Sequence, residues 1–179
     1  MKEKFVMTAF GVDRRGFVSD VAKLLYENDC NIEDTAMMRL EGEFALILVF
    51  TSVGDDTDKR LRMECRRLER EKGISAFCRT VETAKEEEEP TGSMQALYVE
   101  GHELAGIIYK ITKYLAEKNI NIERLVSKIR PSPETGSDLY AIEISIYVPS
   151  GMSEKKLDDE LDRIADELRV EITRSEPDL

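Results

Sequence analysis

The stretch GVDRRGFVSDVAKLLYENDCNIED at residues 11–34 recurs without a gap as GHELAGIIYKITKYLAEKNINIER at residues 101–124. Eight of the 24 aligned positions are identical, far more than unrelated sequences would share. The identical pairs are Gly11/Gly101, Gly16/Gly106, Lys23/Lys113, Leu25/Leu115, Glu27/Glu117, Asn31/Asn121, Ile32/Ile122 and Glu33/Glu123. Self-similarity at a fixed offset indicates a duplication, so we expect two copies of one structural unit.

Hydrophobic periodicity extends each copy into strands and helices. Residues 5–10 are apolar and β-prone, and residues 16–28 have apolar positions at helical spacing. These positions are Val18, Val21, Ala22 and Leu25 in the first copy and Ile108, Ile111, Thr112 and Leu115 in the second. The other expected elements are strands 32–40, 44–51 and 74–82 with helix 58–72 in the first copy, and strands 97–100, 122–130, 139–148 and 169–173 with a helix capped by Ser153 in the second.

The order βαββαβ, found twice, predicts the α+β class with two ferredoxin-like units, at residues 1–82 and 94–179. Each unit would be a four-stranded antiparallel sheet with two helices on one face. The other face and the edges then need cover. We expect the two units to pair side by side into one eight-stranded sheet, with a homodimer as a further step. Residues 83–93, TAKEEEEPTGS, have the composition of an acidic linker, or alternatively of a partner-binding run.

Composition argues against several classes of protein. The net charge of −11 disfavours direct binding to nucleic acid, because that binding depends on cations that neutralise phosphates. The N-terminal residues MKEKFVMTAF lack the apolar run of a secretory signal, and no stretch is long and apolar enough for a membrane span. Three cysteines without paired spacing suit reduced thiols. We therefore expect a cytoplasmic protein that contacts no membrane.

Catalytic and metal-binding patterns are missing from the sequence. His102 is the only histidine, and with three scattered cysteines it makes neither a zinc site nor a Cys–His nucleophile. No phosphate-binding or nucleophile-elbow motif occurs. The chain is expected not to be an enzyme and to use no cofactor or metal. Helix 58–72 is rich in arginine, but interleaved acids favour pairing along the helix over a basic docking patch.

The turn Asp13-Arg14-Arg15-Gly16, followed by an amphipathic helix and then Asn31-Ile32, resembles the ACT domain. ACT domains are βαββαβ units that bind small ligands, usually amino acids, and regulate enzymes or transcription. The resemblance covers both copies and so nearly the whole chain. Two such units without a catalytic or DNA-binding domain are similar in layout to the glycine cleavage system transcriptional repressor family. This resemblance implies an amino-acid sensor, with glycine or serine as the ligand.

The chemistry of the turn fits a free amino acid. Unpaired backbone N–H groups at the start of the first helix suit a carboxylate, and Asp13 could accept from an ammonium group. In ACT domains the start of the second strand often adds an amide across a domain interface, and the matching residues are Asn31 and Asn121. The candidate ligand-binding residues are Gly11, Val12, Asp13, Arg14, Gly16, Asn31 and Ile32 in the first copy and Gly101, His102, Glu103, Gly106 and Asn121 in the second.

Each of these residues also has a purely structural interpretation. The glycines can serve unusual backbone angles, Asp13 can cap the helix, and Asn31 can stabilise a turn. The copies also differ, because Arg14-Arg15 becomes Leu104-Ala105 in the second. We therefore expect an amino-acid-sensing regulator that acts through a protein partner, a transcription factor or a metabolic enzyme. The alternative is a ligand-independent interaction module built on the same fold.

Overall fold

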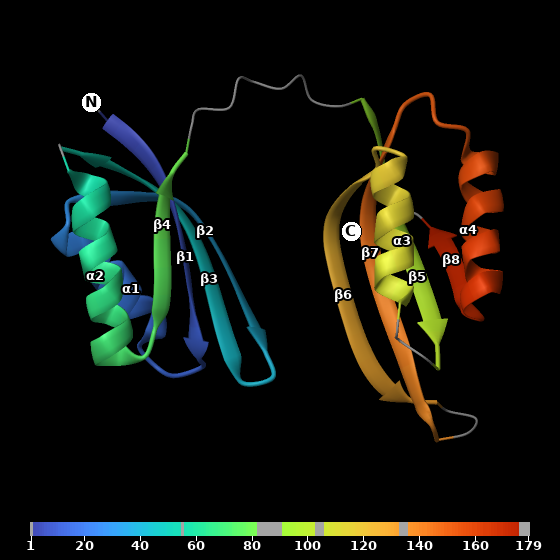
Figure 1. Ribbon diagram of the computed structural model, residues 1–179, viewed down its shortest axis with the longest axis horizontal. Helices are drawn as coiled ribbons and strands as arrows, with labels where there is room; N and C mark the ends of the chain where they lie inside the picture. The colour runs from blue at the N-terminus through green and yellow to red at the C-terminus, as the bar shows by residue number, and fades with distance from the viewer. Residues whose placement is uncertain (1, 55, 82–90, 103–105, 133–135, 176–179) are drawn as a thin grey trace. The chain divides into compact units, whose positions relative to one another are not determined.

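Each half of the chain folds as a separate βαββαβ unit, residues 1–87 and 88–179 (Figure 1). The computed structural model describes residues 2–54, 56–81, 91–102, 106–132 and 136–175. The first unit contains β1 (Lys2–Val12), α1 (Phe17–Glu27), β2 (Cys30–Leu40), β3 (Glu43–Val53), α2 (Thr57–Lys72) and β4 (Ser75–Thr80). The second contains β5 (Gly92–Gly101), α3 (Ile107–Glu117), β6 (Asn121–Pro131), β7 (Asp138–Pro149), α4 (Glu154–Leu168) and β8 (Glu171–Ser175).

Each unit has one four-stranded antiparallel sheet, in the order β2-β3-β1-β4 or β6-β7-β5-β8. The apolar strands β3 and β7 therefore lie inside their sheets. This confirms the predicted ferredoxin-like α+β fold and its duplication. The pairing of the two units into one eight-stranded sheet stays a prediction.

Both helices of a unit cover the same face of its sheet (Figure 1). Strand alternation points every second side chain of β1 and β3 toward them, among them Phe5, Met7 and Phe50, which are fully buried. The rings of Phe5 and Phe50 stack at a centroid distance of 5.6 Å. In the second unit Ile144 and Ile146 of β7 are equally buried. Each sheet thus has a helix-covered face and a face that its own helices leave open.

The buried face of the first helix differs from the predicted one. Phe17, Val21, Leu24 and Leu25 of α1 are buried, whereas Val18 is 44% exposed. The same positions in α3 are Ile107, Ile111, Tyr114 and Leu115, so Ile108 and Thr112 lie beside the core. The prediction is confirmed for Val21 and Leu25 and wrong for Val18, because the apolar arc of these helices is wider than one packing face. The rotation of the helix on the sheet decides which part of the arc is buried.

The segment predicted as a linker, residues 83–93, includes two residues that belong to a strand. Gly92 and Ser93 belong to β5, where they pair with Pro149 and Val148 of β7. Residues 83–90 of the predicted linker lie outside the described residues, so their role stays a prediction. Glycine and serine are weak strand formers, but β7 is long enough to pair with them. Pairing with a neighbouring strand therefore decides where β5 begins, although the local composition is typical of a linker.

Helix α2 carries its charges in pairs. Lys59 contacts Asp56 at 2.8 Å, and Arg62 contacts Asp58 at 2.9 Å. Arg67 contacts Glu64 at 2.8 Å, while Leu61, Cys65 and Leu68 form the buried face as predicted. The exposed arginines of this helix are therefore largely engaged along its surface.

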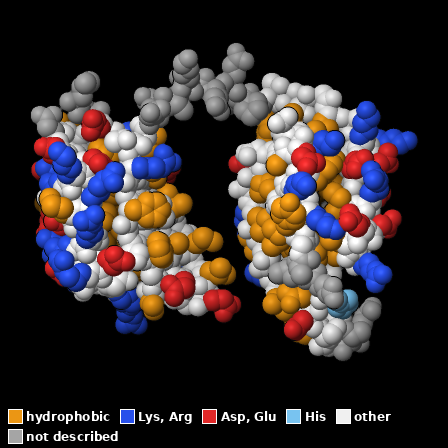
Figure 2. Space-filling view, viewed as in Figure 1, with side chains coloured by type: hydrophobic (Ala, Val, Ile, Leu, Met, Phe, Trp, Pro, Cys, Tyr) orange, Lys and Arg blue, Asp and Glu red, His pale blue; other side chains and the backbone are white. Residues whose placement is uncertain are grey.

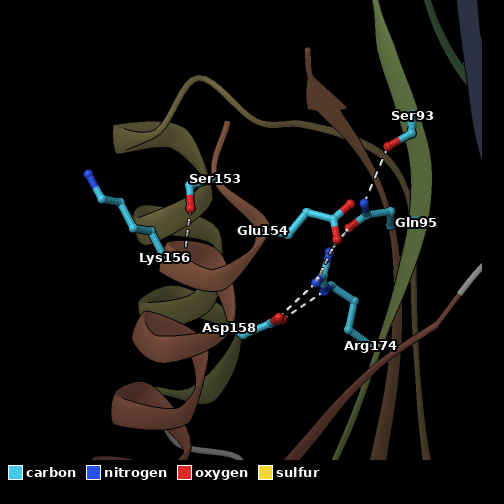
Figure 3. Close-up of polar contacts among 7 residues, drawn as sticks. All are labelled: Ser93, Gln95, Ser153, Glu154, Lys156, Asp158 and Arg174. Atoms are coloured by element: carbon cyan, nitrogen blue, oxygen red, sulfur yellow. Dashed lines mark hydrogen bonds and ion pairs between the residues drawn. The ribbon is translucent and has the colours of Figure 1, made fainter. Parts of the chain in front are cut away.

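A half-buried arginine connects the last strand of the second unit to its neighbours (Figure 3). Arg174 of β8 donates from Nε and Nη2 to the two carboxylate oxygens of Asp158 in α4, both at 2.8 Å. Its Nη1 donates to Oε1 of Gln95 in β5 at 2.7 Å, and Nε2 of Gln95 donates to Ser93 at 3.3 Å. One guanidinium thus links β8 to both a helix and a neighbouring strand. Ser153 caps α4 as predicted, accepting from the Lys156 N–H.

Candidate functional site

The turn between β1 and α1 ends in a left-handed glycine. Gly16 is the N-cap of α1 with φ 88°, and Gly106 is the N-cap of α3 with the same φ. Only glycine adopts this conformation without strain, so the backbone explains both conserved repeat positions. Neither helix receives a side-chain cap from the described residues. The first N–H groups of α1 thus form a positive end that no side chain covers.

Asp13 connects this turn to the β2–β3 hairpin. Its carboxylate pairs with the guanidinium of Arg39 in β2, and its N–H donates to the Gly42 carbonyl at 2.8 Å. Asp13 therefore does not cap α1, and that interpretation was wrong.

Arg14 folds back onto the first turn of the helix. Its Nη2 donates to Asp20 at 2.7 Å, and Lys72 at the end of α2 lies 3.6 Å from the same carboxylate. The hydrogen bond from Arg14 lowers the pKa of Asp20, partial burial opposes this, and the charge of Lys72 lowers it further. Two cations, Arg14 and Lys72, thus contact one carboxylate at the first turn of α1.

We expect the Arg14→Gln variant to raise the pKa of Asp20 toward its ordinary value of 3.8. A pKa that folding lowers contributes stability above the unfolded-state pKa, and that stability is lost as pH falls through the folded-state pKa. The wild type should therefore lose this contribution at a lower pH than the variant. A carboxyl-detected NMR titration of both proteins measures the midpoint. An unchanged midpoint in Arg14→Gln would contradict the assignment.

Close packing at positions 11 and 101 leaves no room for a side chain. A Cβ at Gly11 would lie 2.9 Å from the Gly73 carbonyl oxygen, which is backbone at the end of α2. A Cβ at Gly101 would lie 2.6 Å from the Val170 side chain. Neither position is thereby tied to a ligand. Val12, the last residue of β1, is 67% exposed beside the turn.

Asn31 does not lie near the turn of its own unit. It pairs with Thr51 of β3, whereas Val12 next to the turn pairs with Glu43 at the other end of that strand. Eight residue steps separate Thr51 from Glu43, which is about 27 Å of strand. Asn31 and Ile32 thus stand at one end of the sheet and the turn at the other. One unit by itself cannot bring these candidate residues together.

The second turn differs in its charges. His102 is exposed, and its Nδ1 lies 3.3 Å from the Asp138 carbonyl oxygen. Glu103 lies outside the described residues, so its role stays a prediction. Asn121 donates to Glu123, and Lys110, at the position equivalent to Asp20, contacts Glu167 of α4 at 2.6 Å. The second unit therefore carries a cation at the position where the first carries the carboxylate of Asp20.

Three charged residues near the first turn were not predicted from the sequence. Arg39, Asp20 and Lys72 come from β2, α1 and the end of α2, and they complete the charge pattern around Asp13 and Arg14. Asp20 had a detectable signal, since it lies in the first turn of the predicted helix. Arg39 and Lys72 are distant in sequence, and only the fold brings them to the turn.

Comparison with known proteins supports the fold and assigns the family. The model of the ACT domain matches residues 3–79. UPF0237 protein MK1213 from Methanopyrus kandleri is 36% identical over 73 residues, which are 40% of this chain and 81% of that protein. The chain belongs to the ACT domain family. The matched residues make up the first unit, and the second unit repeats its fold.

Solved structures extend the likeness to both ACT units. A crystal structure of a protein from Galdieria sulphuraria shares 27% identity and a TM-score of 0.76, covering 99% of this chain and 100% of that one. A candidate glycine cleavage system transcriptional repressor shares 23% identity and a TM-score of 0.68, covering 98% and 97%. At that identity the second comparison shows the fold alone, and it confirms the predicted similarity in layout.

Neither a membrane-spanning helix nor a metal-binding cluster occurs in the described ranges. Among the helices in those ranges, none combines the length and the apolar character that a bilayer crossing needs. Within the same part of the chain, no three His, Cys, Asp or Glu side chains are grouped so that they could hold a metal ion. Cys30, Cys65 and Cys78 are free thiols.

Proposed function

We propose that this ACT protein senses a small amino acid at the turn between β1 and α1 of the first unit. The observation that carries the proposal is the start of α1, which has no side-chain cap, with Arg14 and Lys72 on Asp20 of its first turn and Arg39 on Asp13 before it. A helix N-terminus with nearby cations attracts a carboxylate. Asp13 supplies an acceptor for the ammonium group. We take glycine or serine as the ligand, from the resemblance to the repressor family.

The site requires a second ACT unit. Asn31 lies about 27 Å along the strand from the turn of its own unit, so an amide that reaches the ligand has to come from another unit. That unit is either the other half of the chain or a second copy. Ligand binding then stabilises one arrangement of units over another, which is how it would control a protein partner. We take the partner to be a transcription factor or a metabolic enzyme.

A thermal-shift screen of the full-length chain against the twenty amino acids tests this proposal. A ligand present at about 100 times its Kd stabilises the folded state by about 2.7 kcal/mol, which a melting curve resolves. We expect a small amino acid to give this shift. No stabilisation by any of the twenty at millimolar concentration would contradict the proposal.

Matched variants show which unit supplies the amide to the first turn. If a second copy supplies it, Asn31→Ala should weaken binding measured by calorimetry about tenfold or more, because a buried hydrogen bond to a charged group contributes roughly 1.5–3 kcal/mol. If the other half of the chain supplies it, Asn121→Ala should weaken binding instead. Unchanged binding in both variants would contradict an amide contact at this turn.

The second candidate function is a ligand-independent interaction module. The pairing of Asp13 with Arg39 and of Arg14 with Asp20 favours it, since these charges are already satisfied within the unit. In that case Asp13→Asn and Asn31→Ala would leave partner binding unchanged, and no amino acid would shift the melting temperature. A co-purification of the full-length chain with its partner, repeated with both variants, separates the two functions.

A further inference from the structure

The open face of the first sheet, on the side away from α1 and α2, is apolar. Strand alternation places there the residues between the buried positions of β1 and β3, together with their partners in β2 and β4. Six large side chains of this face are exposed: Phe10, Val12, Met38, Leu40, Ile47 and Phe77. Hydrophobic side chains gather over the strands of this unit in Figure 2.

The strand register makes these side chains neighbours. Thr8 pairs with Ile47 on one side and with Phe77 on the other, so the three form one row across the sheet. In the next row Phe10 pairs with Ala45, which pairs with Met38. Side chains directly opposite each other lie about 5 Å apart at Cβ. The exposed apolar residues therefore form one continuous patch.

The equivalent face of the second sheet carries more charges, although the fold is the same. By register and by the repeat, four positions correspond as Phe10 to Glu100, Ile47 to Glu143, Met38 to Lys128 and Phe77 to Thr173. Glu143 pairs with Arg124 at 2.9 Å, and Glu100 pairs with Arg130 at 2.5 Å. These ion pairs border an open hollow of about 390 Å³. The unit thus folds with a charged open face, so the apolar one is not a requirement of the fold.

We infer that the open face of the first sheet is covered by the same face of a second copy of this chain. A large apolar patch on one face marks an interaction site. The centre of the patch carries no charge, so it can pack against itself without burying one, as a two-fold interface requires. Two sheets packed in this way form a sandwich with the sheets about 10 Å apart.

The charges at one end of the patch fit this arrangement. Asp34 of β2, Val49, Val6 and Arg79 of β4 form one row, with opposite charges on its two edges. A two-fold axis parallel to the strands lays β2 of one copy over β4 of the other. Asp34 then faces Arg79 of the partner subunit, and the symmetric pair forms as well. The rim of the face is therefore complementary to itself.

The area of the patch determines how tightly the two copies are expected to associate. The face from the row of Asp34 and Arg79 to the row of Val12, Glu43 and Leu40 spans residues 6–12 of β1, or about 24 Å. Four strands span about 19 Å, so each copy covers roughly 450 Å² with the charged end rows included. Twice this area is slightly below the size at which interfaces become stable. The dimer should therefore be weak and depend on protein concentration.

Sedimentation equilibrium of the full-length chain over a range of concentrations tests the inference. We expect the mass to rise from one chain toward two, and the double variant Ile47→Glu/Phe77→Thr to weaken this association about tenfold or more. The variant carries the residues that the second sheet has at the same positions, so it is compatible with the fold. Met63→Glu changes an exposed apolar residue of α2, 63% accessible, and should leave the association unchanged.

Charge reversal at the rim gives a second test that does not disturb the core. Asp34→Arg should weaken the dimer, and Asp34→Arg/Arg79→Asp should restore it. A wild-type chain that stays monomeric at every concentration would overturn the inference and favour a different protein on this face. A dimer that survives Ile47→Glu/Phe77→Thr would also overturn it, in favour of pairing through a sheet edge.

Discussion

The Leu25→Ala variant is expected to lower the free energy of unfolding of the first ACT unit by roughly 2–5 kcal/mol. Leu25 is fully buried in the core between α1 and the first sheet. The substitution removes three carbon atoms and leaves a cavity that close-packed neighbours fill only partly. For a unit of this size the loss corresponds to a melting temperature lower by about 10 °C or more.

Differential scanning calorimetry of the full-length chain measures this effect, with Leu115→Ala as the matched control. Leu115 is the same position of the repeat and is fully buried in the separate core of the second unit. Because each unit has its own core, Leu25→Ala should shift one unfolding transition and Leu115→Ala the other. A single transition that both variants shift equally would show that the two units unfold together.

The Arg174→Met variant is expected to destabilise the second unit by about 1–3 kcal/mol. Methionine keeps much of the aliphatic volume but removes every donor of the guanidinium. The Gln95 side chain is 8% exposed and would lose the partner of its carbonyl oxygen, while Asp158 is more accessible and can be hydrated. The buried amide, more than the ion pair, therefore accounts for the expected loss.

Urea unfolding of Arg174→Met and of Arg163→Met compares the loss of a half-buried arginine with the loss of an exposed one. Arg163 lies on α4 and contacts Glu160 at 3.0 Å with 75% of its side chain exposed, so its loss should cost less than about 0.5 kcal/mol. A loss of similar size in both variants would show that the network around Arg174 adds nothing beyond a surface ion pair.

Part of the candidate site could be read from the sequence, because it depends on local backbone chemistry. The recurrence of Gly16 as Gly106 at the end of a turn pointed to a special conformation, and both have φ 88°. The surroundings of the turn could not be read in the same way. Arg39 and Lys72 reach it from β2 and α2, and sequence spacing says nothing about such contacts. For the same reason Asp13 looked like a helix cap but pairs with a strand.

The distance between Asn31 and the turn could not be predicted from the sequence either. The sequence places it close to the turn, after one short helix, and the resemblance to ACT domains assigns both to one kind of site. The strand register puts them at opposite ends of the sheet, because α1 returns the chain to the far end, where β2 begins and from which it runs toward the turn. The proposed ligand site thus depends on a second unit.

By itself the sequence determined the order of strands and helices, the duplication and the ACT fold, since hydrophobic periods and turn residues act over a few positions. Only the tertiary structure decided that Val18 faces outward, that Gly92 joins a strand and that the two open sheet faces differ in polarity. Burial and charge pairing depend on residues that are distant in the chain and close in space. The local pattern therefore specifies which elements form, and their packing specifies which surfaces remain for ligands and partners.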